Sequence, residues 1–165
     1  MASLETLTTM VQAFTVSTMT VAKGLGLSLK LDRTQAGPGM RATSSCAAAL
    51  IGVIGDDLKG SVTILTDHGA FRETIATMSG GMIKDPNPDD ALAMSALGEL
   101  ANMICGTALK EFVKVHSVRI DITPPQLFAG EHLRSVPSDM AGIKYFTIPL
   151  KESKGYTIYV VLGFQ

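Results

Sequence analysis

Glu99 and Asn102 are the pair of residues in this sequence whose types and spacing could do chemistry. They lie three positions apart in DDALAMSALGELANMICGTALKEF, a segment that predicts a long helix, and Glu99 is the one charged residue within 91–109. At about 100° per residue, both side chains share one face with Ser95 and Gly106, in a stripe about 60° wide. An ordinary amphipathic helix carries several charged residues on its outer face. The narrow polar stripe therefore needs another explanation.

A carboxylate beside an amide supplies no nucleophile, no metal cage and no phosphate cradle. The amide of Asn102 can, however, hold and aim a water molecule, because it offers both an acceptor and donors. An aimed water matters most in phosphoryl hydrolysis, whose loose transition state needs positioning and charge neutralisation more than bond-making. Glu99 could pair with a lysine of a partner and fix the partner's register. Any metal would have to come from that partner, because we expect neither a metal site nor a bound cofactor in this chain.

Two glycines accompany the stripe: Gly98 lies beside it and Gly106 lies within it. Together they cost the helix about 2 kcal/mol relative to alanine, so we expect the space they leave to be used. In one interpretation they admit a neighbouring helix, and Glu99 and Asn102 are satisfied by their own chain. In the other, the stripe faces outward and enters a concave site on a macromolecular partner. Spacing alone leaves both interpretations open.

Other residues are weaker candidates for chemistry. The three histidines are scattered singly, with no cysteine or carboxylate at metal-ligand spacing. The adjacent carboxylates at 56–57 fall in a predicted turn and are better explained as turn residues. Cys46 and Cys105 lie in apolar segments, so we expect buried thiols rather than a disulfide.

Composition and charge exclude several classes of protein. The formal net charge is −1 with both signs interspersed, so the basic stripe that nucleic-acid binding requires is missing. The first twenty residues have neither a basic start nor a small-residue cleavage site, so we expect no signal peptide. The apolar helix could not cross a bilayer without placing Glu99 and Asn102 near its centre. We therefore expect a soluble cytoplasmic protein that binds no nucleic acid and inserts into no membrane.

The order of elements predicts an α/β (α+β) fold: one layered domain, residues 1–165, with a mostly antiparallel sheet packed against helices. Hydrophobic residues make up 46% of the chain, more than one modest core needs, and the last strand is apolar on both faces. Both features favour self-association. The predicted elements are a helix capped by Ser3, a strand over 24–32, a loop over 33–44, a hairpin over 46–66, a helix over 67–81, a linker over 84–90 whose Asp89 or Asp90 caps the long helix, a strand over 115–123, a polar loop over 124–142 and a hairpin over 143–164.

The pattern Ser95-x3-Glu99-x2-Asn102-x22-Pro125 resembles the signature of the CheC/CheX/FliY family of chemotaxis phosphatases, as do the local texts SALGELANMICG and GVIGDDLKGSVTIL. The resemblance implies a protein phosphatase that hydrolyses the aspartyl phosphate of a CheY-like response regulator. It implies that Glu99 contacts the receiver lysine and that Asn102 orients the attacking water, with Mg²⁺ held in the receiver. Ser95 and Pro125, together with Gly98 and Gly106, would shape the site and contact the partner.

The pattern occurs once, because FRETIATMSGG offers Glu73 but has Ala76 where the amide should stand. A single copy resembles the CheX type, which forms homodimers, rather than the two-site CheC type. The alternative function is a non-catalytic module of the same fold that binds a receiver or a component of the flagellar switch.

Overall fold

An eight-stranded sheet in which every pairing is antiparallel forms the centre of the structure. The structure is a computed structural model that describes residues 3–41 and 44–165. The strand order is β1-β7-β8-β4-β3-β5, with β2 also beside β7 and β6 also beside β3. The strands are β1 (Leu29–Leu31), β2 (Gly37–Pro38), β3 (Ser45–Gly55), β4 (Lys59–Thr66), β5 (Ile120–Ile122), β6 (Gln126–Leu133), β7 (Lys144–Glu152) and β8 (Thr157–Phe164).

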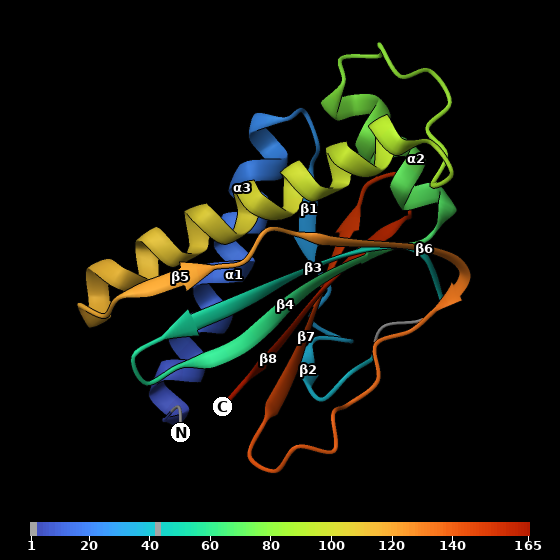
Figure 1. Cartoon of the computed structure of the whole chain (residues 1–165). Coiled ribbons are helices and arrows are strands. Elements are labelled where there is room, and N and C mark those ends of the chain that lie inside the picture. The colour runs from blue at the N-terminus through green and yellow to red at the C-terminus, as the bar shows by residue number, and fades with distance from the viewer. Residues whose placement is uncertain (1–2, 42–43) are drawn as a thin grey trace.

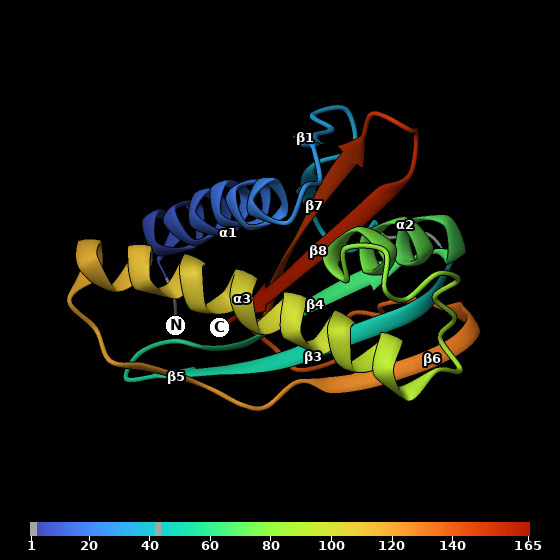
Figure 2. The same ribbon diagram turned by 90° about the horizontal axis from the view of Figure 1, so that it is seen from above.

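Three helices cover one face of this sheet (Figures 1 and 2). The main core lies between that face and the helices, where Phe14, Phe71 and Phe112, one from each helix, are almost completely buried. The opposite face carries a much smaller apolar cluster around Leu65. The predicted class, an antiparallel sheet packed against helices, is confirmed. The helices are α1 (Leu4–Gly24), α2 (His68–Met78) and α3 (Ala91–His116).

Local sequence signals explain where two of the helices begin. The Ser3 hydroxyl accepts the backbone N–H of Thr6 at 3.1 Å, and the Asp90 carboxylate accepts that of Leu92 at 2.9 Å. Each cap satisfies a backbone donor that the first turn of a helix leaves without a partner. The two predicted hairpins are present as β3–β4 and β7–β8.

The end of α3 differs from the predicted strand over 115–123. The helix continues to His116, whose ring stacks on Phe112 with 4.4 Å between the ring centroids. Ser117 then adopts a left-handed conformation with φ of 50°, and the strand β5 that follows is only three residues long. The i,i+4 contact of this ring pair within the helix therefore outweighs the strand propensity of the β-branched residues nearby.

The segment 124–142, predicted as a polar loop, contains the strand β6. Seven of its eight residues are exposed, and it pairs with β3 from Ser45↔Leu133 to Leu50↔Gln126. A strand held by backbone hydrogen bonds at the edge of a sheet, without a buried face, shows no alternating apolar pattern. For this reason the sequence does not mark this segment as a strand.

Two smaller corrections concern residues 24–44. β1 is shorter than predicted, because Leu25 caps the C-terminus of α1 instead of extending the strand. Leu27 and Leu29 are nevertheless buried, as their alternation predicts. The predicted loop over 33–44 contains the short strand β2. Residues 42–43 of this predicted loop lie outside the described residues.

The apolar last strand is explained by its place in the sheet. β8 pairs with β7 and β4 along its two edges, and its two faces contribute to the two apolar clusters of this chain. Val160 and Val161, which point to opposite faces, are accordingly both buried. The composition of β8 therefore gives no support to a dimer.

The two cysteines are free and buried, as predicted. Burial raises the pKa of the Cys105 thiol to about 12, and it also raises the pKa of Cys46. Both thiols stay protonated near neutral pH and act as small apolar side chains.

Candidate functional site

The polar stripe of α3 faces solvent. Leu97 and Leu100 are buried and fix the inward face of the helix. Ser95 and Glu99 are exposed, and Asn102 is half-buried. Because positions three and four apart are neighbours on a helix, the polar groups form one outward surface. This outward position contradicts the interpretation in which Glu99 and Asn102 are structural residues satisfied by their own chain.

The side chains of Glu99 and Asn102 form no hydrogen bond or ion pair with any residue in 3–41 or 44–165. Other acidic side chains are engaged with the chain itself: Asp67 and Asp90 cap helices. A carboxylate and an amide without internal partners are held in fixed directions by a helix whose inward face is buried. Their full hydrogen-bonding capacity is available to another molecule.

A wall beside the stripe is formed by Pro125 and Leu127, at the start of β6. A Cβ placed on Gly98 would lie 3.2 Å from Leu127 Cδ2 and 3.4 Å from Pro125 Cγ, so these side chains occupy the space that the glycine leaves. Gly98 is about 40° from Asn102 around the helix axis and about 100° from Glu99, which puts the wall on the Asn102 side. The structure thus brings Pro125 to the site. The neighbour of Gly98 is a strand of the same chain, not another helix.

Leu127 is the member of this surface that the sequence did not reveal. It is 38% exposed and rests against Gly98. The segment around it was predicted as a loop, and no local pattern links it to a residue on α3. Leu127 follows Pro125 by two residues, so in an extended strand both side chains lie on the same face, toward α3.

Gly106 differs from Gly98, because no described atom outside its own helix backbone and chain neighbours lies within 4 Å of a Cβ built there. Packing within the described residues therefore does not explain this glycine. It leaves an opening on the outward face, one turn beyond Asn102.

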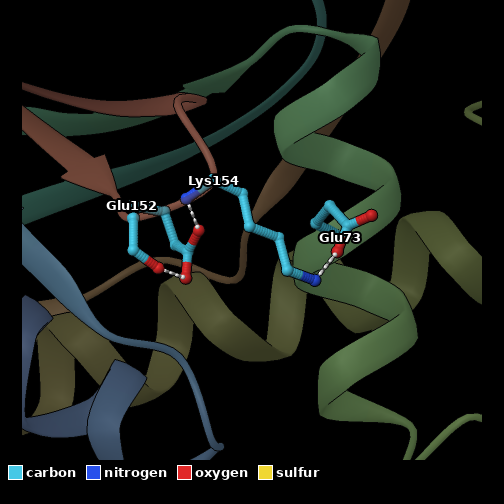
Figure 3. A network of polar contacts seen from close by, with 4 residues as sticks. Glu73, Glu152 and Lys154 are labelled. Atoms are coloured by element: carbon cyan, nitrogen blue, oxygen red, sulfur yellow. Dashed lines mark hydrogen bonds and ion pairs between the residues drawn. The ribbon is translucent and has the colours of Figure 1, made fainter.

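The glutamate of α2 is engaged, in contrast to Glu99. Lys154 Nζ lies 2.9 Å from Glu73 Oε2 and ties α2 to the turn between β7 and β8 (Figure 3). The Glu152 carboxylate accepts the backbone N–H of Lys154 and, at 2.9 Å, the Ser153 hydroxyl, and these hydrogen bonds lower the pKa of Glu152. With its carboxylate paired and Ala76 in place of an amide, α2 does not reproduce the surface of α3.

α3 is long and apolar enough to cross a membrane by length and composition. In this structure 56% of its most apolar window is buried inside the protein. Its apolar side chains are thus explained by packing against the sheet, as in the core helix of a soluble protein.

Comparison with known proteins decides the family. A family model described as chemotaxis phosphatase CheX matches residues 47–150, more than half of the chain. The chain belongs to the CheX family. The matched range includes all of α3 and the start of β6, and hence the whole outward surface described above.

Relatives of known name and structure agree with this assignment. The CheY-P phosphatase CheX of Thermotoga maritima is 36% identical over 104 residues, which cover 62% of this chain but only 58% of that protein. CheX from Vibrio vulnificus has a TM-score of 0.79 at 23% identity, over 94% of this chain and 99% of that one. A chain of the CheX–CheY–BeF3–Mg²⁺ complex from Borrelia burgdorferi has a TM-score of 0.75 at 18% identity, over 94% and 97%. These two structures share the CheX fold with almost the whole chain.

Proposed function

We propose that this chain is a protein phosphatase that hydrolyses the aspartyl phosphate of a CheY-like response regulator, acting as a soluble protein of the cytoplasm. The observation that carries the proposal is the outward pair of Glu99 and Asn102, which have no partner among the described residues. Membership of the CheX family and the name of the Thermotoga maritima relative, CheY-P phosphatase, support the same activity.

Asn102 is the group that we assign to the reaction itself. Water attacks phosphorus, the bond to the aspartyl oxygen breaks, and the products are a free aspartate and inorganic phosphate. The side-chain carbonyl of Asn102 accepts a hydrogen bond from the water and holds its oxygen in line with the breaking bond. Positioning of this kind lowers the barrier because the loose transition state demands little covalent help from the protein.

Glu99 and the wall position the receiver. The Glu99 carboxylate forms an ion pair with the receiver lysine and fixes the rotation of α3 in the receiver pocket. Pro125 and Leu127 lie against Gly98, one turn before Asn102, and in the complex they would limit access of bulk water from that side of the helix. Mg²⁺ neutralises phosphate charge from a site in the receiver, in keeping with the Borrelia burgdorferi complex that contains CheY, BeF3 and Mg²⁺.

The proposal is tested by incubating the protein with Mg²⁺-bound phospho-receivers encoded by the same genome and following the loss of phosphate. Faster loss than from the receiver alone supports a phosphatase. Tight binding to a phospho-receiver without faster loss of phosphate would instead identify the non-catalytic binding module.

Gly106→Ala should raise the stability of the protein and weaken its binding of the phospho-receiver. Since no neighbour occupies the space, alanine is expected to raise the free energy of unfolding by about 0.5–1 kcal/mol through helix propensity. The added methyl group lies on the surface that enters the receiver, so the concentration of phospho-receiver that half-saturates the enzyme should rise at least threefold. Chemical denaturation and initial rates measure the two effects. A variant that is more stable and equally active would show that no partner approaches Gly106.

We also propose that the protein is a homodimer joined through β6. This strand forms the outer edge of the sheet beside β3, and its residues are exposed over almost its whole length. Long exposed edge strands readily pair with another chain, and Phe128, 46% exposed, adds an apolar contact beside the edge. A twofold axis at this edge would join two sheets by antiparallel pairing.

Light scattering should therefore give a mass near twice the 17.4 kDa of one chain. Phe128→Lys is expected to shift the equilibrium toward monomer at least tenfold, since it places like charges close together across the axis. Val16→Lys, at an exposed apolar position on α1 (59% exposed), is the matched control and should leave the dimer intact. A wild-type protein that stays monomeric at high concentration would contradict the proposal.

A further inference from the structure

Leu92 is an apolar side chain that the fold does not use. It lies in the first turn of α3 and is 65% exposed, whereas the other three leucines of the helix are exposed by 7% or less. Its backbone N–H is bound by the cap residue Asp90, so the position of Leu92 is fixed by the start of the helix. Covering this side chain with a partner is favourable, because it removes apolar surface from water.

Leu92 is aligned with the polar pair. It precedes Glu99 by seven residues, which places it about 20° from Glu99 around the axis and about 10 Å along it. Exposed Ser95 lies between them on the same face. The outward surface therefore continues from Asn102 and Glu99 through Ser95 to an exposed leucine.

The polar pair thus has apolar side chains on two sides: Leu92 beyond Ser95, and Pro125 with Leu127 beside Asn102. Apolar contacts around a polar centre exclude water from it, which strengthens the hydrogen bonds and ion pairs at that centre. Charge adds a second constraint. No lysine or arginine occurs within 85–109, while Asp89 and Asp90 closely precede Leu92.

We infer that Leu92 anchors the receiver and helps to determine which receivers are accepted; this inference rests on the proposed function. The receiver surface that covers Leu92 is an apolar patch with basic side chains at its border, next to the phosphorylation pocket. Leu92 acts in binding and not in the chemical step, because it lies two helical turns from Glu99.

Leu92→Ser tests the inference. Initial rates should show the half-saturating concentration of phospho-receiver rising about tenfold, with the maximal rate changed less than twofold. Binding of the receiver loaded with BeF3 and Mg²⁺, followed by calorimetry, should weaken by the same factor. Val115→Ser is the matched control: Val115 is 69% exposed on the same helix but points about 160° away from Glu99, so both values should stay unchanged.

The outcomes for Leu92 and for the proposed function are distinguishable. Unchanged half-saturation and unchanged binding in Leu92→Ser, in an enzyme that Asn102→Ala inactivates, overturn the anchor and leave the phosphatase in place. An equal loss in Val115→Ser also overturns the anchor. A wild-type protein that binds the loaded receiver without hydrolysing phosphate overturns the phosphatase, and the calorimetric comparison of Leu92→Ser with wild type still decides the anchor. A wild-type protein that binds no receiver overturns both.

Discussion

Asn102→Ala is expected to lower the maximal rate of receiver dephosphorylation at least a hundredfold. In the proposed mechanism the amide aims the attacking water, and removing a single positioning group from a phosphoryl-transfer or hydrolytic site has effects of this size. The rate is measured as phosphate released from a Mg²⁺-bound phospho-receiver at saturating concentration.

Two controls show whether the loss lies in the chemical step. The Asn102 side chain has no partner among the described residues, so the free energy of unfolding should change by less than about 0.5 kcal/mol. Binding of the receiver loaded with BeF3 and Mg²⁺ should weaken less than tenfold. Unchanged turnover would remove Asn102 from the mechanism, and a large loss of stability would return it to a structural role.

Glu99→Lys is expected to weaken receiver binding about a hundredfold. In the proposed complex the substitution turns the ion pair with the receiver lysine into a contact between like charges, which costs several kcal/mol at an interface. Since Glu99 is exposed and forms no ion pair within the described part of the chain, the free energy of unfolding should change by less than about 0.5 kcal/mol. Calorimetry with the loaded receiver measures the binding.

Glu111→Lys is the matched control for charge. Glu111 is also an exposed glutamate of α3, paired with Lys114 at 2.7 Å, and it points about 120° away from Glu99. Both variants change the net charge equally, so long-range attraction between the proteins is affected alike. If Glu111→Lys weakened binding as much as Glu99→Lys, the effect would come from overall charge and not from a specific ion pair.

The sequence allowed the site on α3 to be predicted because a helix makes the relation between residues local. The spacing of Ser95, Glu99 and Asn102 places them on one face wherever the helix begins or ends. The buried leucines determine which way that face points. The caps at Ser3 and Asp90 are equally local, since each involves neighbouring residues.

The parts of the site that come from β6 depend on tertiary structure. Gly98 receives Pro125 and Leu127, and this contact exists only because β6 pairs with the N-terminal half of β3 below α3. An exposed edge strand has no buried face to mark it in the sequence, so neither the strand nor Leu127 could be predicted. The end of α3 at His116 has a local cause instead: His116 stacks on Phe112, four residues earlier in the same helix, and extends the helix through residues that favour a strand.

The difference between Gly98 and Gly106 also depends on tertiary structure. Both lie in or beside the stripe, and sequence gives both the same cost in helix stability. Side chains of the same chain occupy the space beside Gly98, so this glycine serves the fold. The space beside Gly106 is left empty by the described residues and is available to a partner.

The most direct test of the outward pair is the structure of this protein bound to its receiver loaded with BeF3 and Mg²⁺. We expect α3 to enter the receiver pocket, with the Asn102 amide about 3 Å from a water in line with beryllium and the Glu99 carboxylate beside the receiver lysine. A complex in which the receiver binds another face of the protein, leaving Glu99 and Asn102 in solvent, would contradict the mechanism.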